Sequence, residues 1–353
     1  MMQATSSRRR FLTIAAVVGA AASIPRWAWS STALANSDWR GTALGAPASM
    51  RLVHPDRSLA QQAITACVHE IKRLEHIFSL YQSDSEIRRL NRTGQLVHPP
   101  QELVEVLAFS LQLARQSKGH FDPSIQPLYE LYAAHFRTPS RDAHGPSEQA
   151  LQQALDKVDH RAITVESDRI RFEQPEMAIT LNGVAQGYIT DRIAHLLAQY
   201  GFEDILIDVG EIRAHGHRAD GRQWTAAVAD PRASQPADQH LLSVQLGKPS
   251  PALATSSGFG SPFHSTTKPG QLPGFHHLLN PHTGHSAAQY HSVSVRAPNA
   301  MLADGLSTAL TVMPEEPAQA LLTHWAHTQA WLLDAQGHMI KMGTHRQTEE
   351  TTA

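Results

Sequence analysis

Asp304 and Thr308 are the side chains whose types and spacing point most directly to chemistry. They lie four residues apart in a run of residues typical of a helix, so both oxygen groups project from one face. A carboxylate and a hydroxyl supply part of a magnesium site, and Mg²⁺ commonly completes its oxygen shell with substrate phosphates and water. The pair therefore predicts a substrate that carries a phosphate or diphosphate. An isolated Asp-x-x-x-Thr pair is more often solvated on a helix surface, so this interpretation depends on the neighbouring motifs.

His277 is the candidate general base. It opens the segment 277–284 (HLLNPHTG), and Gly284 lies twenty residues before Asp304. An unperturbed imidazole titrates near pH 6.5, which suits proton transfer, and a purely structural histidine is the alternative of equal weight. Thr283 and Gly284 after Pro281 predict a turn that orients His277. The 22 histidines are otherwise scattered without zinc-ligand spacing, so we expect no structural zinc.

Composition limits the possible partners. The 353 residues, 41% of them hydrophobic and 18% charged, suffice for one large domain or two modest ones. A net charge of -2 gives no basic surface for nucleic acid, which we do not expect as a partner. Cys67 is the only cysteine, so no intramolecular disulfide can form, and we expect it to be a buried apolar residue.

The first 35 residues resemble a twin-arginine export signal. Arg8, Arg9 and Arg10 precede an apolar stretch over 11–24, and the small residues at 33–35 offer a cleavage site. We expect the mature chain to begin near Asn36 and to reach the periplasm or the outside. The apolar stretch is too short to span a bilayer core of about 30 Å, so no permanent membrane anchor is expected. The domain itself is placed at 36–345, followed by a disordered tail over 346–353.

Hydrophobic periodicity predicts an α+β fold: a single compact domain of mixed sheets with flanking helices. The loop over 79–91 should enter a short helix capped by Asp84 or Ser85. Residues 134–146 read as a surface loop, and Gln336-Gly337 as the turn of a hairpin over 330–341. Helices are expected at 57–78, 101–117, 184–200, around Asp304 and near 315–326, and strands at 178–181, 205–208, 224–228 and 292–296, with a strand-helix-strand unit in the middle.

Four further segments join the two motifs above in a fixed order. They are 119–128 (GHFDPSIQPL), 181–191 (LNGVAQGYITD), 206–212 (LIDVGEI) and 254–258 (ATSSG). Each is weak alone, but together they resemble the ApbE family of FAD:protein FMN transferases. Residues 44–46 and 79–91 also fit, so the resemblance covers roughly 42–342.

The resemblance implies that Mg²⁺-bound FAD is split at its diphosphate. FMN passes to a Ser or Thr hydroxyl of an acceptor, such as a flavoprotein subunit of an exported or membrane redox complex, and AMP leaves. Metal-binding positions carry over to Asp304, Thr308 and the backbone carbonyl of Gly183. Flavin-binding positions carry over to Leu44, Ser79, Leu80, Tyr81, His120, Phe121, Asp122, Thr180, Gln186 and Leu279.

Several of these positions depart from the family pattern. Gln186 stands where a lysine is frequent, Thr180 where an acidic residue is frequent, and Glu211 replaces a glycine. Asn280 replaces the usual Asp before Pro281. His282 replaces a commonly basic residue, and Ser257 replaces a glycine. Loss of charge weakens electrostatic stabilisation without destroying the fold. The alternatives are therefore an FAD-binding protein or FAD diphosphatase without transfer activity, or an exported metal-binding or interaction domain that shares only the fold.

Overall fold

The computed structural model describes residues 12–13, 35–138, 142–233, 239–264 and 270–343. The predicted tail lies outside these residues, as does the predicted export signal apart from Leu12, Thr13 and Ala35. Among the described helices, none is long and apolar enough to cross a membrane.

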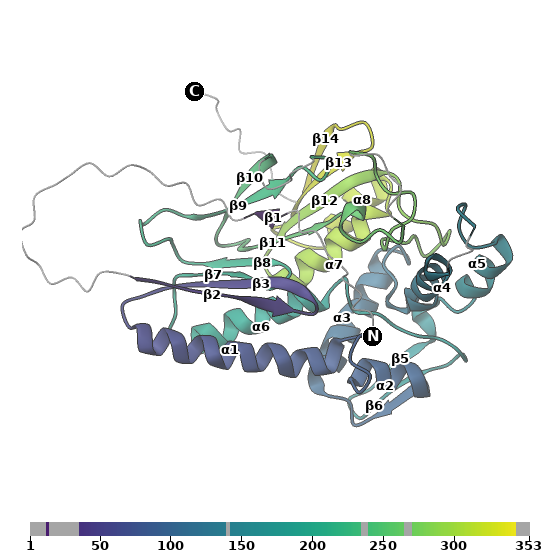
Figure 1. Cartoon of the computed structure of the whole chain (residues 1–353), viewed down its shortest axis with the longest axis horizontal. Helices are drawn as coiled ribbons and strands as arrows, with labels where there is room; N and C mark the ends of the chain where they lie inside the picture. Colours follow the sequence, from purple (N-terminus) through teal and green to yellow (C-terminus); the bar gives the residue numbers. More distant parts are fainter. Residues whose placement is uncertain (1–11, 14–34, 139–141, 234–238, 265–269, 344–353) are drawn as a thin grey trace, which may run out of the picture.

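An eight-stranded sheet forms the centre of the fold (Figure 1), in the order β14-β13-β12-β11-β8-β7-β3-β2. All its pairings are antiparallel. The two smaller described sheets, β1-β9-β10 and β4-β6-β5, are antiparallel as well, where mixed sheets were predicted. The strands of the central sheet are β2 (Ala35–Ala43), β3 (Ala46–His54), β7 (Ile205–Asp208), β8 (Ile212–His215), β11 (Ala252–Ser256), β12 (Tyr290–Ala297), β13 (Gln329–Asp334) and β14 (Met339–Gly343).

Each face of this sheet is covered by a different layer. Alternate side chains of a strand point to opposite faces, so Ile205 and Ile207 enter the main core while Leu206 enters a second one. The main core packs against α1 (Arg57–Phe78), α6 (Ala185–Gln199) and α7 (Ala300–Thr311). On the opposite face, the second core joins the sheet to β9 (Trp224–Ala229) and β10 (His240–Leu246), with β1 (Leu12–Thr13) beside β9.

Helix α1 follows the predicted range. Its N-terminus is capped by Asp56, whose Oδ1 accepts hydrogen bonds from the backbone N–H groups of Ser58 and Leu59. Its apolar stripe is buried, including Cys67, and burial raises the pKa of that thiol to about 12. The prediction for Cys67 is confirmed.

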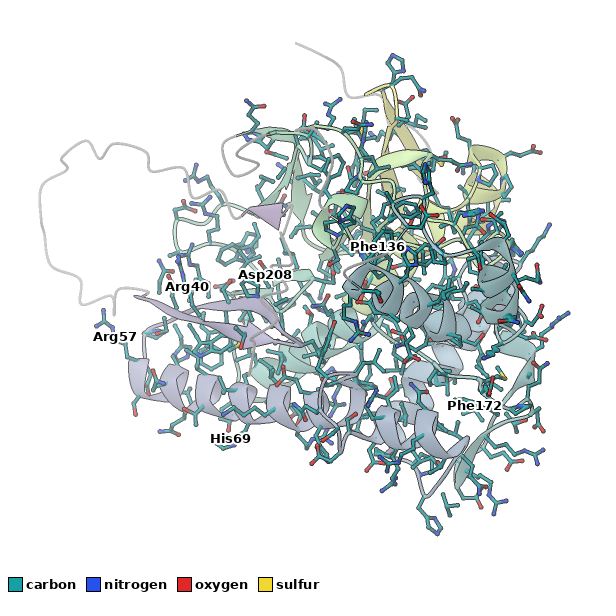
Figure 2. All side chains as sticks on the ribbon, turned by 45° about the vertical axis from the view of Figure 1, so that its right-hand side comes forward. Arg40, Arg57, His69, Phe136, Phe172 and Asp208 are labelled. Atoms are coloured by element: carbon teal, nitrogen blue, oxygen red, sulfur yellow. The ribbon has the colours of Figure 1, made fainter. Side chains whose placement is uncertain are left out.

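Smaller helices gather at one end of the molecule (Figure 1). There, α4 (Gln126–Arg137) and α5 (Glu148–Leu155) bury Tyr132 and Phe136 in a separate aromatic cluster; Figure 2 labels Phe136. In the part of the chain that the structure describes, the remaining elements are α2 (Glu86–Thr93), α3 (Gln101–Gln116), α8 (Glu315–Leu322), β4 (Gln95–Val97), β5 (Ile163–Val165), β6 (Arg169–Phe172) and three short 3₁₀ helices at Pro123–Ile125, His160–Ala162 and Gly258–Gly260. Ser85 caps α2, as predicted.

One predicted strand and the start of one predicted loop were wrong, and one predicted helix is shorter than expected. Residues 178–181 form no strand, because the side chain of Asn91 pairs with both backbone groups of Ile179 and the Thr180 N–H bonds to the Pro123 carbonyl. The predicted strand-helix-strand unit is therefore absent. Residues 134–137 continue α4 because Phe136 is buried there, and α8 stops at Leu322 instead of 326.

Candidate active site

The three predicted metal positions meet where α6 and α7 begin to cross. Gly183 lies directly against Thr308: a Cβ built on this glycine would be 2.9 Å from Thr308 Oγ1. Asp304 is only 5% exposed, and its Oδ2 accepts a hydrogen bond from the Gly187 N–H at 3.1 Å. This bond satisfies a first-turn donor of α6, an end where a negative charge is favoured.

Two serines complete this group of oxygen atoms. Ser256, the last residue of β11, lies 2.8 Å from Ser307 and 3.5 Å from Thr308, measured between the hydroxyl oxygens. In the described part of the chain, no group of three or more His, Cys, Asp or Glu side chains is arranged to hold a metal. A carboxylate, a hydroxyl and the Gly183 backbone are an oxygen-only donor set. Such a set fits Mg²⁺ whose other ligands come from substrate phosphates.

The turn between β7 and β8 lies beside the first turn of α6. A Cβ on Gly210, whose φ is +110°, would be 2.7 Å from side-chain atoms of Gln186, so glycine is required here. Asp208 and Glu211 flank this turn and are 7% and 6% exposed; Figure 2 labels Asp208. Two of the departures from the family pattern, Gln186 and Glu211, are thus on neighbouring segments.

The segment 120–122 faces a cluster of histidines. His120 and His282 are in edge contact with ring centroids 4.6 Å apart, and burial, aided by His282, lowers the pKa of His120. Asp122 Oδ2 lies 2.9 Å from His160 Nδ1, while its Oδ1 accepts from both the N–H and the hydroxyl of Ser124. The Asp122 side chain is therefore already bonded within the protein.

Thr180 connects this segment to the metal positions. Its N–H bonds to the Pro123 carbonyl at 2.8 Å, and its hydroxyl accepts from the Asn182 N–H at 3.2 Å. The backbone of Pro123 is thus bonded to a residue three positions before Gly183.

Leu44 lies at the tip of the β2–β3 hairpin, with φ values of +46° at Leu44 and +75° at Gly45. The carboxylate of Glu75 accepts from the Leu44 N–H, and burial raises the pKa of Glu75. After α1, the Ser79 hydroxyl accepts from the Tyr81 N–H, and Tyr81 itself is 63% exposed. Leu80 packs against the edge of the main core.

His277 lies on a hairpin-like loop that connects β11 to β12. The predicted turn is present: the Gly284 N–H bonds to the Asn280 carbonyl, and the Asn280 side chain accepts from the His282 N–H. His276, the residue before His277, is 1% exposed and packs against Gly258. Both of its ring nitrogens are hydrogen-bonded: Nδ1 to the Leu278 N–H and Nε2 to the Ala287 carbonyl. Burial lowers the pKa of His276 to about 4, so it is a neutral structural residue.

Two predicted flavin contacts have inward-facing side chains. Phe121 is 5% exposed in the main core, and Leu279 is 6% exposed in the cluster between α4 and α5. Because both side chains are buried, these two residues could contact a ligand only through their backbone atoms or after a modest rearrangement.

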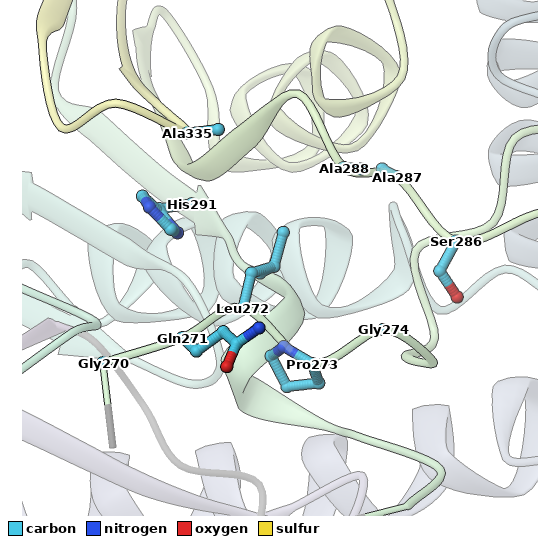
Figure 3. Close-up of a pocket in the computed structure, with 10 residues that line it drawn as sticks. All are labelled: Gly270, Gln271, Leu272, Pro273, Gly274, Ser286, Ala287, Ala288, His291 and Ala335. Carbon is cyan, nitrogen blue, oxygen red and sulfur yellow. The ribbon is translucent and has the colours of Figure 1, made fainter. Parts of the chain in front are cut away.

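A cleft of about 540 Å³ is lined mainly by the loop between β11 and β12 (Figure 3). It is lined by residues 270–274, 286–288, His291 and Ala335. None of the predicted flavin or metal residues is in this lining. Most of the lining belongs to the β11–β12 loop that carries His277, and the Ser286 hydroxyl bonds to both backbone groups of His276.

Sequence reasoning missed several residues that build this site. Ser256 was quoted only as part of a motif, although it contacts Thr308. Asp191 closed the motif at 181–191 without a role, yet both of its oxygens accept bonds from the first turn of α7. Its spacing of four from Gly187 was the available signal, because that spacing places both residues on one helix face.

Fold and site together define a class of protein: an α+β domain with an oxygen-rich, partly buried site at the junction of two helices. The ApbE family model matches residues 44–332, and the chain belongs to the ApbE family. The resemblance seen in the sequence is thereby confirmed.

Curated relatives and solved structures agree with this assignment. The chain is 27% identical to the FAD:protein FMN transferase of Haemophilus influenzae over 256 residues, covering 70% of this chain and 71% of that protein. It is 28% identical to the transferase of the same name from Vibrio cholerae over 249 residues, covering 69% and 71%. The solved flavin transferase ApbE from V. cholerae has the same fold, with a TM-score of 0.70 at 22% identity over 87% of this chain and 97% of that one. The ApbE protein of Thermotoga maritima gives a TM-score of 0.71 at 24% identity, with the same coverage.

Proposed function

We propose that this protein is an FAD:protein FMN transferase that requires Mg²⁺. The observation that carries the proposal is the convergence of Gly183, Asp304 and Thr308 in a member of the ApbE family. In the reaction, the acceptor hydroxyl oxygen forms a bond to the phosphorus of the FMN half of FAD. The bond from that phosphorus to the bridging oxygen breaks, AMP leaves, and the hydroxyl proton passes to a base.

Phosphoryl transfer depends mainly on positioning and on stabilisation of charge. Asp304, Thr308 and the Gly183 carbonyl would hold the metal, which when bound neutralises charge on the diphosphate. Helix α6 begins at Ala185, and its N-cap residue, Val184, makes no side-chain hydrogen bond to the first turn, where the one carboxylate bond described is that of Asp304 to the Gly187 N–H. This helix end favours an anionic phosphate beside Gly183.

His277 is the base in this proposal. His276 is unsuited because its ring is buried and both nitrogens are bonded. His277 is less buried than His276, and its N–H bonds to the Ser261 carbonyl in the loop that begins after Ser256, whose hydroxyl oxygen lies 3.5 Å from that of Thr308.

The flavin is assigned to the remaining positions. Leu44, the segment 79–81, the segment 120–122, Thr180, Gln186 and Leu279 would contact FAD. Because the Phe121 and Leu279 side chains are buried, their contribution is through backbone and shape. The acceptor is proposed to be an exported or membrane-bound flavoprotein, in keeping with the twin-arginine pattern at 7–12 and a periplasmic or exported location.

One observation favours an alternative. Gln186 and Glu211 lie near the α6 terminus, where one removes a frequent positive charge and the other adds a buried carboxylate. Both changes disfavour a polyanion, so the second candidate is an FAD-binding protein or FAD diphosphatase that has lost transfer activity.

The test is to incubate the mature protein with FAD, Mg²⁺ and an exported flavoprotein domain, and to measure acceptor mass and AMP together. A mass gain equal to FMN with stoichiometric AMP supports transfer. AMP and free FMN without a mass gain indicate the diphosphatase, and intact bound FAD indicates the binding protein. Asp304→Asn, which keeps the side-chain shape, should abolish turnover while the protein stays folded; unchanged turnover removes Asp304 from the metal site.

A further inference from the structure

Helices α6 and α7 exchange carboxylate caps. Asp304 of α7 accepts from the Gly187 N–H in the first turn of α6. In return, Asp191 of α6 accepts from the N–H groups of Ala300 and Met301, the first two residues of α7, each at 2.9 Å. Asp191 follows Gly187 by four residues and Asp304 follows Ala300 by four, so each carboxylate is one turn along its own helix.

Between these two caps, the backbones of α6 and α7 are in direct contact at Gly187 and Ala300. A Cβ on Gly187 would be 2.3 Å from the Ala300 carbonyl oxygen, which leaves no space between the backbones. Asp191 is also paired with Arg213 of β8, and its side chain is 18% exposed. This ion pair fixes Asp191 to the central sheet, so the first turn of α7 is held against both the sheet and α6.

The position of Asp304 follows from this arrangement. Its Oδ2 is directed to Gly187 N, so the direction of the other oxygen depends on how α7 is placed along α6. Asn299 also caps α7, through the Leu302 N–H at 2.8 Å, but this cap lies within one segment and ties α7 to nothing else. Of the two side chains that cap the N-terminus of α7, only Asp191 also joins this helix to α6.

We propose that Asp191 is a positioning residue for the metal site: its cross-helix cap sets the placement of Asp304, and loss of that cap weakens metal binding. This inference rests on the proposed function, because it takes Asp304 to be a metal ligand. Asp191 itself touches neither metal nor substrate in the proposal.

The experiment compares Asp191→Asn with the matched control Asn299→Ala. Binding of Mn²⁺, a paramagnetic substitute for Mg²⁺, is measured in the presence of ADP as the loss of the free-ion resonance signal beyond the loss that the same concentration of ADP causes without protein. ADP carries the diphosphate but no flavin, so no turnover occurs. Thermal unfolding is measured on the same samples.

We expect Asp191→Asn to raise the Mn²⁺ dissociation constant about tenfold or more, because the amide NH₂ cannot accept the second bond from α7. Asn299→Ala should lower the melting temperature by a few degrees and change the dissociation constant less than twofold. Equal Mn²⁺ affinity in Asp191→Asn and the wild type would overturn the inference alone, as would an equal loss in both variants. No Mn²⁺ binding by the wild type would overturn the proposed metal site itself.

Discussion

Gly187→Ala gives the most direct test of how tightly the site depends on the crossing of α6 and α7. The added methyl group would lie 2.3 Å from the Ala300 carbonyl oxygen and 2.7 Å from Met301 Cα, whereas ordinary contact begins at 3.4 Å. Both atoms are backbone, so the helices must separate by about 1 Å. Overpacking of this kind costs about 1–3 kcal/mol of stability. A displacement of about 1 Å at a reacting centre costs about 100-fold in rate.

The assay measures the melting temperature and the initial rate of AMP release at saturating Mg²⁺ and FAD. Gly247→Ala is the matched control, since nothing lies within 4 Å of its added Cβ and its φ is not positive. We expect this control to behave as the wild type does. If Gly187→Ala loses less than twofold in rate and melts within a degree of the control, the site does not depend on close contact between α6 and α7.

Three further predictions concern other parts of the site. Gln186→Lys restores a positive charge at the α6 terminus and should raise the rate of AMP release about tenfold; an unchanged rate would mean that the glutamine is adapted to this protein's acceptor. The pKa of His276 is near 4 in the folded state and about 6.5 in the unfolded chain, so the unfolded state binds the proton more readily between these values. Stability present above pH 6.5 should fall by about 2 kcal/mol at pH 5, and a ring that titrates near pH 6.5 by NMR would contradict this. Asn91→Ala leaves both backbone groups of Ile179 without their side-chain partner and should cost about 2 kcal/mol in denaturant unfolding; a loss below about 0.5 kcal/mol would show that water replaces the amide.

Local periodicity predicted the long helices well. Helix α1 matches its predicted range because its apolar stripe is continuous, and β7 matches because its four residues are all buried. The β2–β3 hairpin was not predicted, because β2 is largely polar and its turn uses Leu44, a residue that rarely adopts positive φ. Residues 178–181 looked like a strand, but the partner of Ile179 is a side chain 88 residues away. Such tertiary hydrogen bonds leave no local pattern.

The part of the site that lies on a single helix could be predicted, because local spacing is visible in the sequence. Asp304 and Thr308 share a helix face, which spacing alone reveals. The exchange of caps between Asp191 and Asp304 joins residues more than a hundred positions apart, and no spacing rule connects them. The burial of Phe121 and Leu279 likewise depends on how distant helices pack.

The loop that carries His277 leaves the sheet at Ser256 and returns at Tyr290, yet β11 and β12 are direct neighbours with continuous pairing from Ala252–Ala297 to Ser256–Val293. An excursion that begins and ends on adjacent strands can change in length or sequence without shifting the register of the sheet. The α6–α7 junction is built from other segments. Changes in length or sequence within 257–289 should therefore leave the crossing of α6 and α7, and with it the placement of Asp304 and Thr308, unaltered.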